Sequence, residues 1–433
     1  MTDPSKSTLV FFAISTLLLA VTLLPEVTGE DGWEPDHVIT WSPDEGPIVV
    51  DETVDIDETT RLVIEAGVEV RFDPDTGIKV KGHLRVEGTE GEPVMFIPNT
   101  TGPVVNNSWE GISLLSESTG RSHRVDHAMF QGAHTGLLVS STEALVQDST
   151  FDLNRYGMLA RGMAEAEVRG CRFTNNSVLG LEFETGADGL VVDCEFEDNV
   201  VGVFCYEGSA PQVVNCDFRA NYHHISFSGS NGTVRSCTLR DAIAEAFECY
   251  DHSSPLLVDV TMEGQDDDGI HVRNASRPRM VGGTPVSQLG VDSKDNASYA
   301  IAMAWITVEV RDDDGKRMVE ANVTLNGASG MTFSQGSTND EGRLEGAMMS
   351  MYTLDSSGGL DRENPHMVIV EWRGHEQTFR VDPRDLDNDR VLKIEMDIGP
   401  SEPGGWGFIP NVLVLLAISV IATLLAWWYL QRR

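Results

Sequence analysis

Side chains that could recognise a ligand recur at two outward positions of a repeated segment in the middle of the chain. They are two phenols, a carboxylate, an imidazole and a guanidinium: Tyr206, Tyr250, Glu248, His271 and Arg273. Aromatic rings beside planar polar groups suit sugars, which offer apolar faces and hydroxyl groups. The sequence therefore predicts that these five residues bind an extracellular polysaccharide or a surface glycan.

The same region offers a weaker case for catalysis. A glycoside hydrolase needs two carboxylates about 5–9.5 Å apart, and Glu248, Asp267 and Asp268 could supply them. A lyase would need a basic side chain beside calcium-binding acids, and Arg273 after the acidic run 266–268 is the candidate. The alternative interpretation is that this run is a solvated bend without chemistry.

Two other motifs contain residue types that bind metals. Asp385, Asp387 and Asp389 alternate as calcium ligands do, but the loop glycine and closing glutamate of an EF-hand are missing. His223 and His224 are adjacent, and adjacent strand residues point to opposite faces, so this dipeptide is not expected to supply two ligands to one ion. We expect no resident cofactor, with calcium as the alternative.

A repeat of 21 to 23 residues organises these positions, in seven copies between 125 and 272. Each copy has a large apolar anchor: Phe130, Phe151, Phe173, Phe196, Phe218, Leu239 and Met262. Two residues before the anchor stands a small residue: Ala128, Ser149, Cys171, Cys194, Cys216, Cys237 and Val260. Apolar residues alternate within each copy, so its elements are strands. A fixed period of this length indicates units stacked on one another.

Three short strands and three bends fit into one repeat, which makes it one coil of a parallel β-solenoid. Equivalent side chains then stack at about 4.8 Å, so anchors and small residues form interior columns. A further column of asparagines can satisfy bend amides: Asn154, Asn176, Asn199 and Asn221. All six cysteines fall at inward positions, which favours core packing over disulfides or zinc.

Several segments resemble the right-handed parallel β-helix proteins of the pectate-lyase-like superfamily: VVDCEFEDNVVGVFC (191–205), LVIEAGVEVRF (62–72), VKGHLRVEGTEGEPVMFIP (80–98) and WEGISL (109–114). The resemblance implies an all-β chain with a right-handed parallel β-helix over 46–304. It implies no single function, because this fold hosts lyases, hydrolases, adhesins and binding proteins. DDDGI (266–270) resembles the paired aspartates of polygalacturonase-like enzymes, whose Gly-His-Gly and Arg-Ile-Lys elements are absent.

A different alternation begins at Trp305 and predicts a small β-sandwich over 305–398. Short alternating strands and Asn/Asp/Gly turns follow one another in ITVEVRDDDGKRMVEANVTLNG (306–327), STNDEGRLEG (337–346), HMVIVEWRGHEQTFRV (366–381) and RVLKIEMDI (390–398). Their order resembles the carboxypeptidase-regulatory-like, transthyretin-like modules. That resemblance implies a spacer or adhesion unit without catalysis of its own.

The N-terminal segment is apolar between residues 9 and 24, and small residues follow the apolar run. The run is short for a membrane span, so residues 1–29 are predicted to be a secretory signal peptide, followed by a lead-in at 30–45. An uncleaved anchor is the alternative.

The C-terminal segment predicts a single transmembrane helix over 408–430, because it is apolar, flanked by tryptophans and closed by a basic tail at 431–433. A linker at 399–407 precedes it. The bulk of the chain would then be extracellular at the cell membrane. Pro403-Gly404-Gly405 before the helix resembles tripartite C-terminal sorting signals, which implies the alternative that the helix is removed.

Composition fits this placement. The chain has 433 residues, with 31 basic and 68 acidic side chains and a net charge of −37, so nothing would neutralise nucleic-acid phosphates. Asn-x-Ser/Thr acceptors predict a glycosylated surface protein, at Asn99, Asn106, Asn231, Asn274, Asn296 and Asn322. A further acceptor at Asn175 lies beside the inward asparagine column.

The sequence as a whole predicts a membrane-anchored surface β-helix protein that binds a glycan or another extracellular polymer. A polysaccharide hydrolase or lyase is the first alternative. A structural coat or adhesion component, with the solenoid as a stiff rod, is the second.

Overall fold

The computed structural model describes residues 35–398 except 116–121, 265–268, 285–290, 294, 296, 356–362 and 387–388. The predicted signal peptide at 1–29 and the predicted transmembrane helix at 408–430 lie outside the described residues. None of the described helices has the length and apolar character needed to cross a membrane. Within the described ranges, two 3-10 helices, η2 (Pro43–Glu45) and η5 (Pro383–Asp385), accompany the β-strands.

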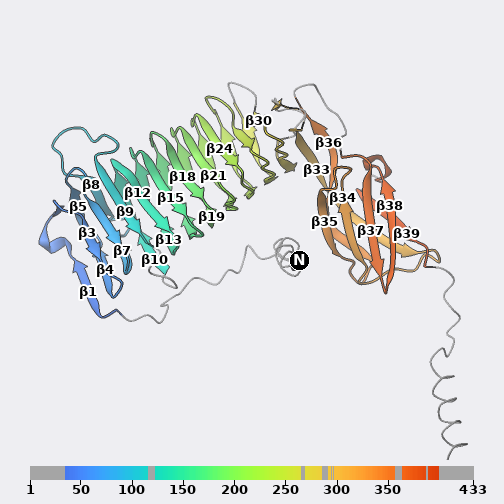
Figure 1. The fold of residues 1–433 in the computed structure, drawn as a ribbon, viewed down its shortest axis with the longest axis horizontal. Helices are drawn as coiled ribbons and strands as arrows, with labels where there is room; N and C mark the ends of the chain where they lie inside the picture. Colours follow the sequence, from blue (N-terminus) through green and yellow to red (C-terminus); the bar gives the residue numbers. More distant parts are fainter. Residues whose placement is uncertain are drawn as a thin grey trace, which may run out of the picture.

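Three parallel sheets run along the solenoid, and the coils follow one another in chain order (Figure 1). Sheet A contains β1 (His37–Trp41), β4 (Thr60–Glu65), β7 (His83–Glu87), β10 (Ser122–Asp126), β13 (Glu143–Gln147), β16 (Glu165–Arg169), β19 (Asp188–Val192), β22 (Gln212–Val214), β25 (Thr233–Arg235), β28 (Leu256–Val258), β31 (Arg279–Val281) and β33 (Ala300–Asp312). Sheet B contains β2 (Ile48–Val50), β5 (Glu69–Phe72), β8 (Val94–Pro98), β11 (Ala128–Gln131), β14 (Thr150–Asp152), β17 (Arg172–Thr174), β20 (Glu195–Glu197), β23 (Asp217–Arg219), β26 (Thr238–Arg240) and β29 (Thr261–Glu263). Sheet C contains β3 (Val54–Ile56), β6 (Gly77–Val80), β9 (Trp109–Leu114), β12 (Ala133–Ser140), β15 (Tyr156–Arg161), β18 (Leu179–Glu184), β21 (Val201–Tyr206), β24 (His223–Ser228), β27 (Phe247–Tyr250), β30 (Ile270–Val272) and β32 (Val291–Ser293).

The predicted anchors pair with one another across sheet B, which confirms the parallel β-solenoid. Phe130, Phe151, Phe173, Phe196 and Phe218 are successive register partners. Their rings stack with centroids 4.7–4.9 Å apart and exclude water throughout. An aromatic stack of this kind buries a large apolar area and also gains direct ring–ring attraction.

The four cysteines before the anchors form the predicted interior column. Cys171, Cys194, Cys216 and Cys237 are free and buried, as are Cys205 and Cys249. Each thiol of the column lies within hydrogen-bonding distance of a valine carbonyl one coil earlier, as Cys194 Sγ does at 3.6 Å from Val168 O. Core packing is therefore confirmed over disulfides.

The asparagine column satisfies backbone groups that the bends would otherwise leave unpaired. The Nδ2 of Asn199 donates to Phe173 O at 2.9 Å, and its Oδ1 accepts from Asn176 N at 3.1 Å. Asn154 and Asn176 repeat the pattern, and Asn221 Nδ2 donates to Phe196 O. Each amide therefore bridges neighbouring coils inside the core.

The bends before the anchor strands take the left-handed backbone conformation that their sequences predict. The φ values are between 47° and 59° at Asp148, Gly170, Asp193, Asn215, Ser236 and Asp259. Glycine, asparagine and aspartate tolerate this region better than other residues. None of these six bend positions carries a β-branched residue, so the backbone turns there without the strain that such a residue would cause.

The C-terminal strands continue from the last coil without a break. Strand β33 pairs in parallel with β31 of the solenoid, antiparallel with β36 (Arg343–Leu354) and in parallel with β39 (Val391–Met396). Sheet D lies beside them, with β35 (Thr332–Ser337), β34 (Asn322–Asn326), β37 (His366–Trp372) and β38 (His375–Val381). A second apolar cluster, including Val308, Val323 and Val370, holds this part together. The expected boundary at 304/305 falls inside β33.

Replacing Asn199 with alanine should destabilise the chain by about 2–4 kcal/mol, because Phe173 O and Asn176 N–H would be left buried without partners. Chemical denaturation followed by circular dichroism measures the change. The matched control is Asn106→Ala at an exposed asparagine, which should change stability by less than about 0.5 kcal/mol. Equal stability of the two variants would contradict a structural role for the asparagine column.

Candidate functional site

The predicted ligand-binding residues lie on the outer face of sheet C. One outward column contains register partners from successive coils: Phe204, Ser226, Glu248, His271 and Asp292. A parallel column contains Tyr206, Ser228 and Tyr250, and Arg273 follows the end of β30. The alternation in the sequence thus placed the predicted residues on one face, and their ligand-binding role stays a prediction.

Four side chains converge on this face, and we call His223, Glu245, Glu248 and His271 the His–Glu cluster. The Nδ1 of His223 lies 3.3 Å from Glu245 Oε2 and 3.8 Å from Glu248 Oε2. The Nδ1 of His271 lies 3.4 Å from Glu245 Oε1 and 3.7 Å from Glu248 Oε1. All four side chains are only 14–17% exposed, so the two carboxylates sit between two imidazoles with little water access.

The surroundings hold the cluster in position. Ser226 Oγ donates to Glu248 Oε2 at 2.8 Å from the neighbouring coil. His271 Nε2 lies 3.8 Å from Asp292 Oδ2 on the other side. Glu248 and His271 are carried by strands β27 and β30, which fix their backbone positions through the sheet. Strands thus carry His223, Glu248 and His271, and the bend before β27 carries Glu245.

Two members of the cluster were not predicted as site residues. His223 lies on the outer face, while its neighbour His224 is buried beside the inward Ile225, so the alternation breaks at this point; burial lowers the pKa of the His224 imidazole to about 4. Glu245 lies in the bend before β27, outside any alternating strand. Its carboxylate reaches the strand face through the bend, so no period in the sequence pointed to it.

An aromatic strip lies beside the cluster. Tyr206 and Tyr250 stand two coils apart with Ser228 between them, and Ser228 Oγ donates to Asp251 Oδ2 at 2.9 Å. The guanidinium carbon of Arg273 lies 4.5 Å from the centroid of the Tyr250 ring. Burial, and then the nearby Glu248 carboxylate, raises the pKa of Tyr250 to about 12, so its hydroxyl stays a hydrogen-bond donor at neutral pH.

A second unusual carboxyl group lies further along the same column. Glu182 is flanked in register by Leu159 and Phe204 and is 9% exposed. Burial between these apolar neighbours, together with the charge of Glu184, raises the pKa of Glu182 to about 7.

The structure describes only some of the remaining predicted residues. Asp267, Asp268, Asp387 and Asn296 lie outside the described residues, so the proposed separation between Glu248 and Asp267 or Asp268 stays untested. Asp385 Oδ2 accepts from the backbone N–H of Asp382, the residue that caps η5, and calcium at Asp385, Asp387 and Asp389 stays a prediction. The other predicted acceptors are exposed: Asn99, Asn106, Asn231, Asn274 and Asn322.

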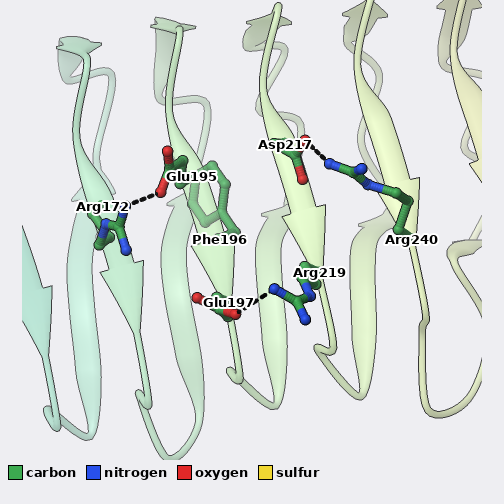
Figure 2. Close-up of a pocket in the computed structure, with 7 residues that line it drawn as sticks. All are labelled: Arg172, Glu195, Phe196, Glu197, Asp217, Arg219 and Arg240. Carbon is green, nitrogen blue, oxygen red and sulfur yellow. Dashed lines mark hydrogen bonds and ion pairs between the residues drawn. The ribbon is translucent and has the colours of Figure 1, made fainter.

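The outer face of sheet B contains a hollow of about 310 Å³, but its charged groups are already paired (Figure 2). Arg172 pairs with Glu195, Arg219 with Glu197 and Arg240 with Asp217, each across one coil step. These pairs are about half exposed, so they contribute little to stability. We therefore assign the hollow to an ion-paired surface and not to the site.

Comparison with known proteins supports the fold. The family model described as the right handed beta helix region matches residues 135–284, which agrees with the stacked coils and confirms a right-handed parallel β-helix. None of the curated proteins compared with the chain matches it significantly.

Three solved structures are similar at low identity. The Agl-KA catalytic domain is 14% identical with a TM-score of 0.36, covering 55% of this chain and 50% of that one. A GH87 alpha-1,3-glucanase from Streptomyces thermodiastaticus strain HF3-3 is 10% identical with a TM-score of 0.25, covering 60% and 62%. The gp42 tailspike of Acinetobacter phage vb_AbaP_AS12 is 7% identical with a TM-score of 0.34, covering 81% and 82%. This chain spans half of the first and about three fifths of the second, and likeness at this level does not identify its ligand or reaction.

Replacing Glu182 with glutamine should stabilise the chain at pH 8 and leave its stability unchanged below the ordinary glutamate pKa of 4.5. The folded state binds the proton more tightly, so the native stability falls as pH rises from about 4.5 to about 7 and then levels off. The gain at pH 8 should be about 3 kcal/mol at most. Urea denaturation at pH 4.5 and pH 8 measures it, with exposed Glu143→Gln as the control.

A gain from Glu182→Gln that is the same at both pH values would contradict the raised pKa. The raised pKa would also be contradicted if the native chain lost no stability relative to the variant between pH 4.5 and pH 8.

Proposed function

We propose that this chain binds an extracellular polysaccharide on the outer face of sheet C. The observation that carries the proposal is the aromatic strip beside the His–Glu cluster. Tyr206, Tyr250 and the Arg273 guanidinium offer stacking surfaces, and the cluster offers planar polar groups within the same few coils.

The physical argument is one of matched surfaces. A sugar ring presents an apolar face of C–H groups and a rim of hydroxyls, and an aromatic ring beside hydrogen-bonding groups satisfies both. The residue between the two tyrosines in register is the small and buried Ser228, so no other large side chain separates the two rings along the strip. A rigid sheet also spares the binding site the entropy of ordering a loop.

The remaining parts of the chain fit a surface role. We propose that 46–304 forms the recognition unit and that 305–398, as a carboxypeptidase-regulatory-like sandwich, acts as a spacer. Residues 1–29 would direct secretion, and 408–430, after the linker 399–407, would anchor the chain in the cell membrane. The high net negative charge of −37 suits a solvated extracellular surface.

Polysaccharide hydrolysis is the second candidate, and one observation favours it. Two carboxylates, those of Glu245 and Glu248, lie on the same face with oxygens no more than 4.8 Å apart, and a pair of carboxylates is what glycoside hydrolysis requires. Release of new reducing ends from a bound polysaccharide, abolished by Glu248→Gln, would establish this activity. Binding without such release would leave recognition as the function.

Tyr206→Ala and Tyr250→Ala should each weaken polysaccharide binding by about 10-fold, since each removes one stacking surface worth about 1.4 kcal/mol. The measurement is an array of neutral and acidic extracellular polysaccharides probed with the purified full-length chain. Tyr156→Ala is the matched control, because Tyr156 lies on the same sheet beside Arg155, two coils before β21 and four before β27.

The proposal fails if the chain binds no polysaccharide on the array. It also fails if Tyr156→Ala weakens binding as much as the two variants at the strip.

A further inference from the structure

The contacts inside the His–Glu cluster are too long for ordinary hydrogen bonds. Good N–H···O bonds measure about 2.7–3.2 Å, whereas the four imidazole–carboxylate contacts measure 3.3–3.8 Å. The Nδ1 of His223 is buried without a hydrogen-bond partner, although it points at two carboxylates. The groups therefore surround a common centre without satisfying one another.

The same distances fit a different arrangement. Two ligands that each lie about 2.0–2.2 Å from a tetrahedral ion are about 3.3–3.6 Å apart. The separation between His223 Nδ1 and Glu245 Oε2 is 3.3 Å, and that between His223 Nδ1 and Glu248 Oε2 is 3.8 Å. One ligand atom from each of His223, Glu245 and Glu248 lies within 4.8 Å of the others, so small side-chain rotations would bring all three onto one ion.

We propose that His223, Glu245 and Glu248 bind a divalent transition-metal ion on the outer face of sheet C. Neutral imidazole together with two carboxylates gives the site a charge of −2, which an M²⁺ ion would neutralise. Three protein ligands leave a coordination position for water or for a ligand oxygen, as in open metal sites. This inference does not depend on the proposed polysaccharide binding.

His271 and Asp292 would position the ligands. His271 Nδ1 contacts the carboxylate oxygens that face away from His223, and its Nε2 lies 3.8 Å from Asp292 Oδ2. A histidine held between carboxylates in this way fixes ring orientation and carboxylate rotation, which is the usual role of groups around metal ligands.

The ligand types select the ion. Calcium prefers six to eight oxygen ligands, while imidazole favours zinc and its transition-metal neighbours. The site offers one imidazole nitrogen and two carboxylates. Zn²⁺ should therefore bind and Ca²⁺ should not compete at equal concentration.

Isothermal titration of the chelator-treated, full-length chain with Zn²⁺ alone tests the site. We expect about one ion per chain. His223→Ala, Glu245→Gln and Glu248→Gln should each weaken binding by at least about 100-fold, and His271→Ala by about 10–100-fold. The controls are His127→Ala, an outward histidine of another bend, and Glu143→Gln on sheet A; both should bind Zn²⁺ as the parent does.

Thermal unfolding tests the metal site even where a variant is less stable than the parent chain. Zn²⁺ should raise the melting temperature of the parent and of both controls, because binding only to the native state stabilises it. It should not raise the melting temperature of the three ligand variants, whatever their starting stability. Absence of stoichiometric Zn²⁺ binding by the parent, or unchanged binding in His223→Ala, Glu245→Gln and Glu248→Gln, would overturn the proposal.

Discussion

Parallel pairing in a fixed register is the constraint on which the rest of the structure depends. It places every residue beside its counterpart 21 to 23 positions along the chain, as the phenylalanine partners of sheet B show. Each interior position must therefore pack against copies of itself. Aromatic rings do so by stacking flat, thiols lie near a carbonyl of the preceding coil, and asparagine amides both donate and accept hydrogen bonds. Three very different side chains can therefore pack against their own copies in neighbouring coils.

The outer face is free of that requirement, and the charged His–Glu cluster lies there. Side chains from four coils meet in the His–Glu cluster and at Asp292 although they are spread over residues 223–292. Charges that would be costly in the core are held here on three strands and one adjoining bend, with restricted access to water. The strip of Tyr206, Ser228 and Tyr250 runs beside them on the same strands. The solenoid thus works as a scaffold that brings distant residues into one surface.

Much of this arrangement could be predicted, because residues that are one repeat apart in the sequence of a solenoid lie side by side in the structure. The alternation identified the interior cysteines and asparagines and placed Glu248, Tyr250 and His271 on one outward face. It could not identify Glu245, because a bend has no alternation and the direction of its side chain depends on local backbone geometry. His223 was treated as part of a dipeptide, and only the inter-coil contacts show its carboxylate neighbours. Nor could alternation show that β33 continues from the solenoid into the C-terminal strands.

Alkylation of the six cysteines in the native chain, followed by mass spectrometry, tests the stacked interior most directly. All six thiols are buried, and hydrogen bonding within the column and burial hold the pKa of the thiols of Cys194, Cys205, Cys216, Cys237 and Cys249 far above the ordinary value. The account predicts no labelling of the native chain and full labelling after denaturation. Rapid labelling of Cys171, Cys194, Cys216 or Cys237 in the native chain would contradict the interior columns and the surface built on them.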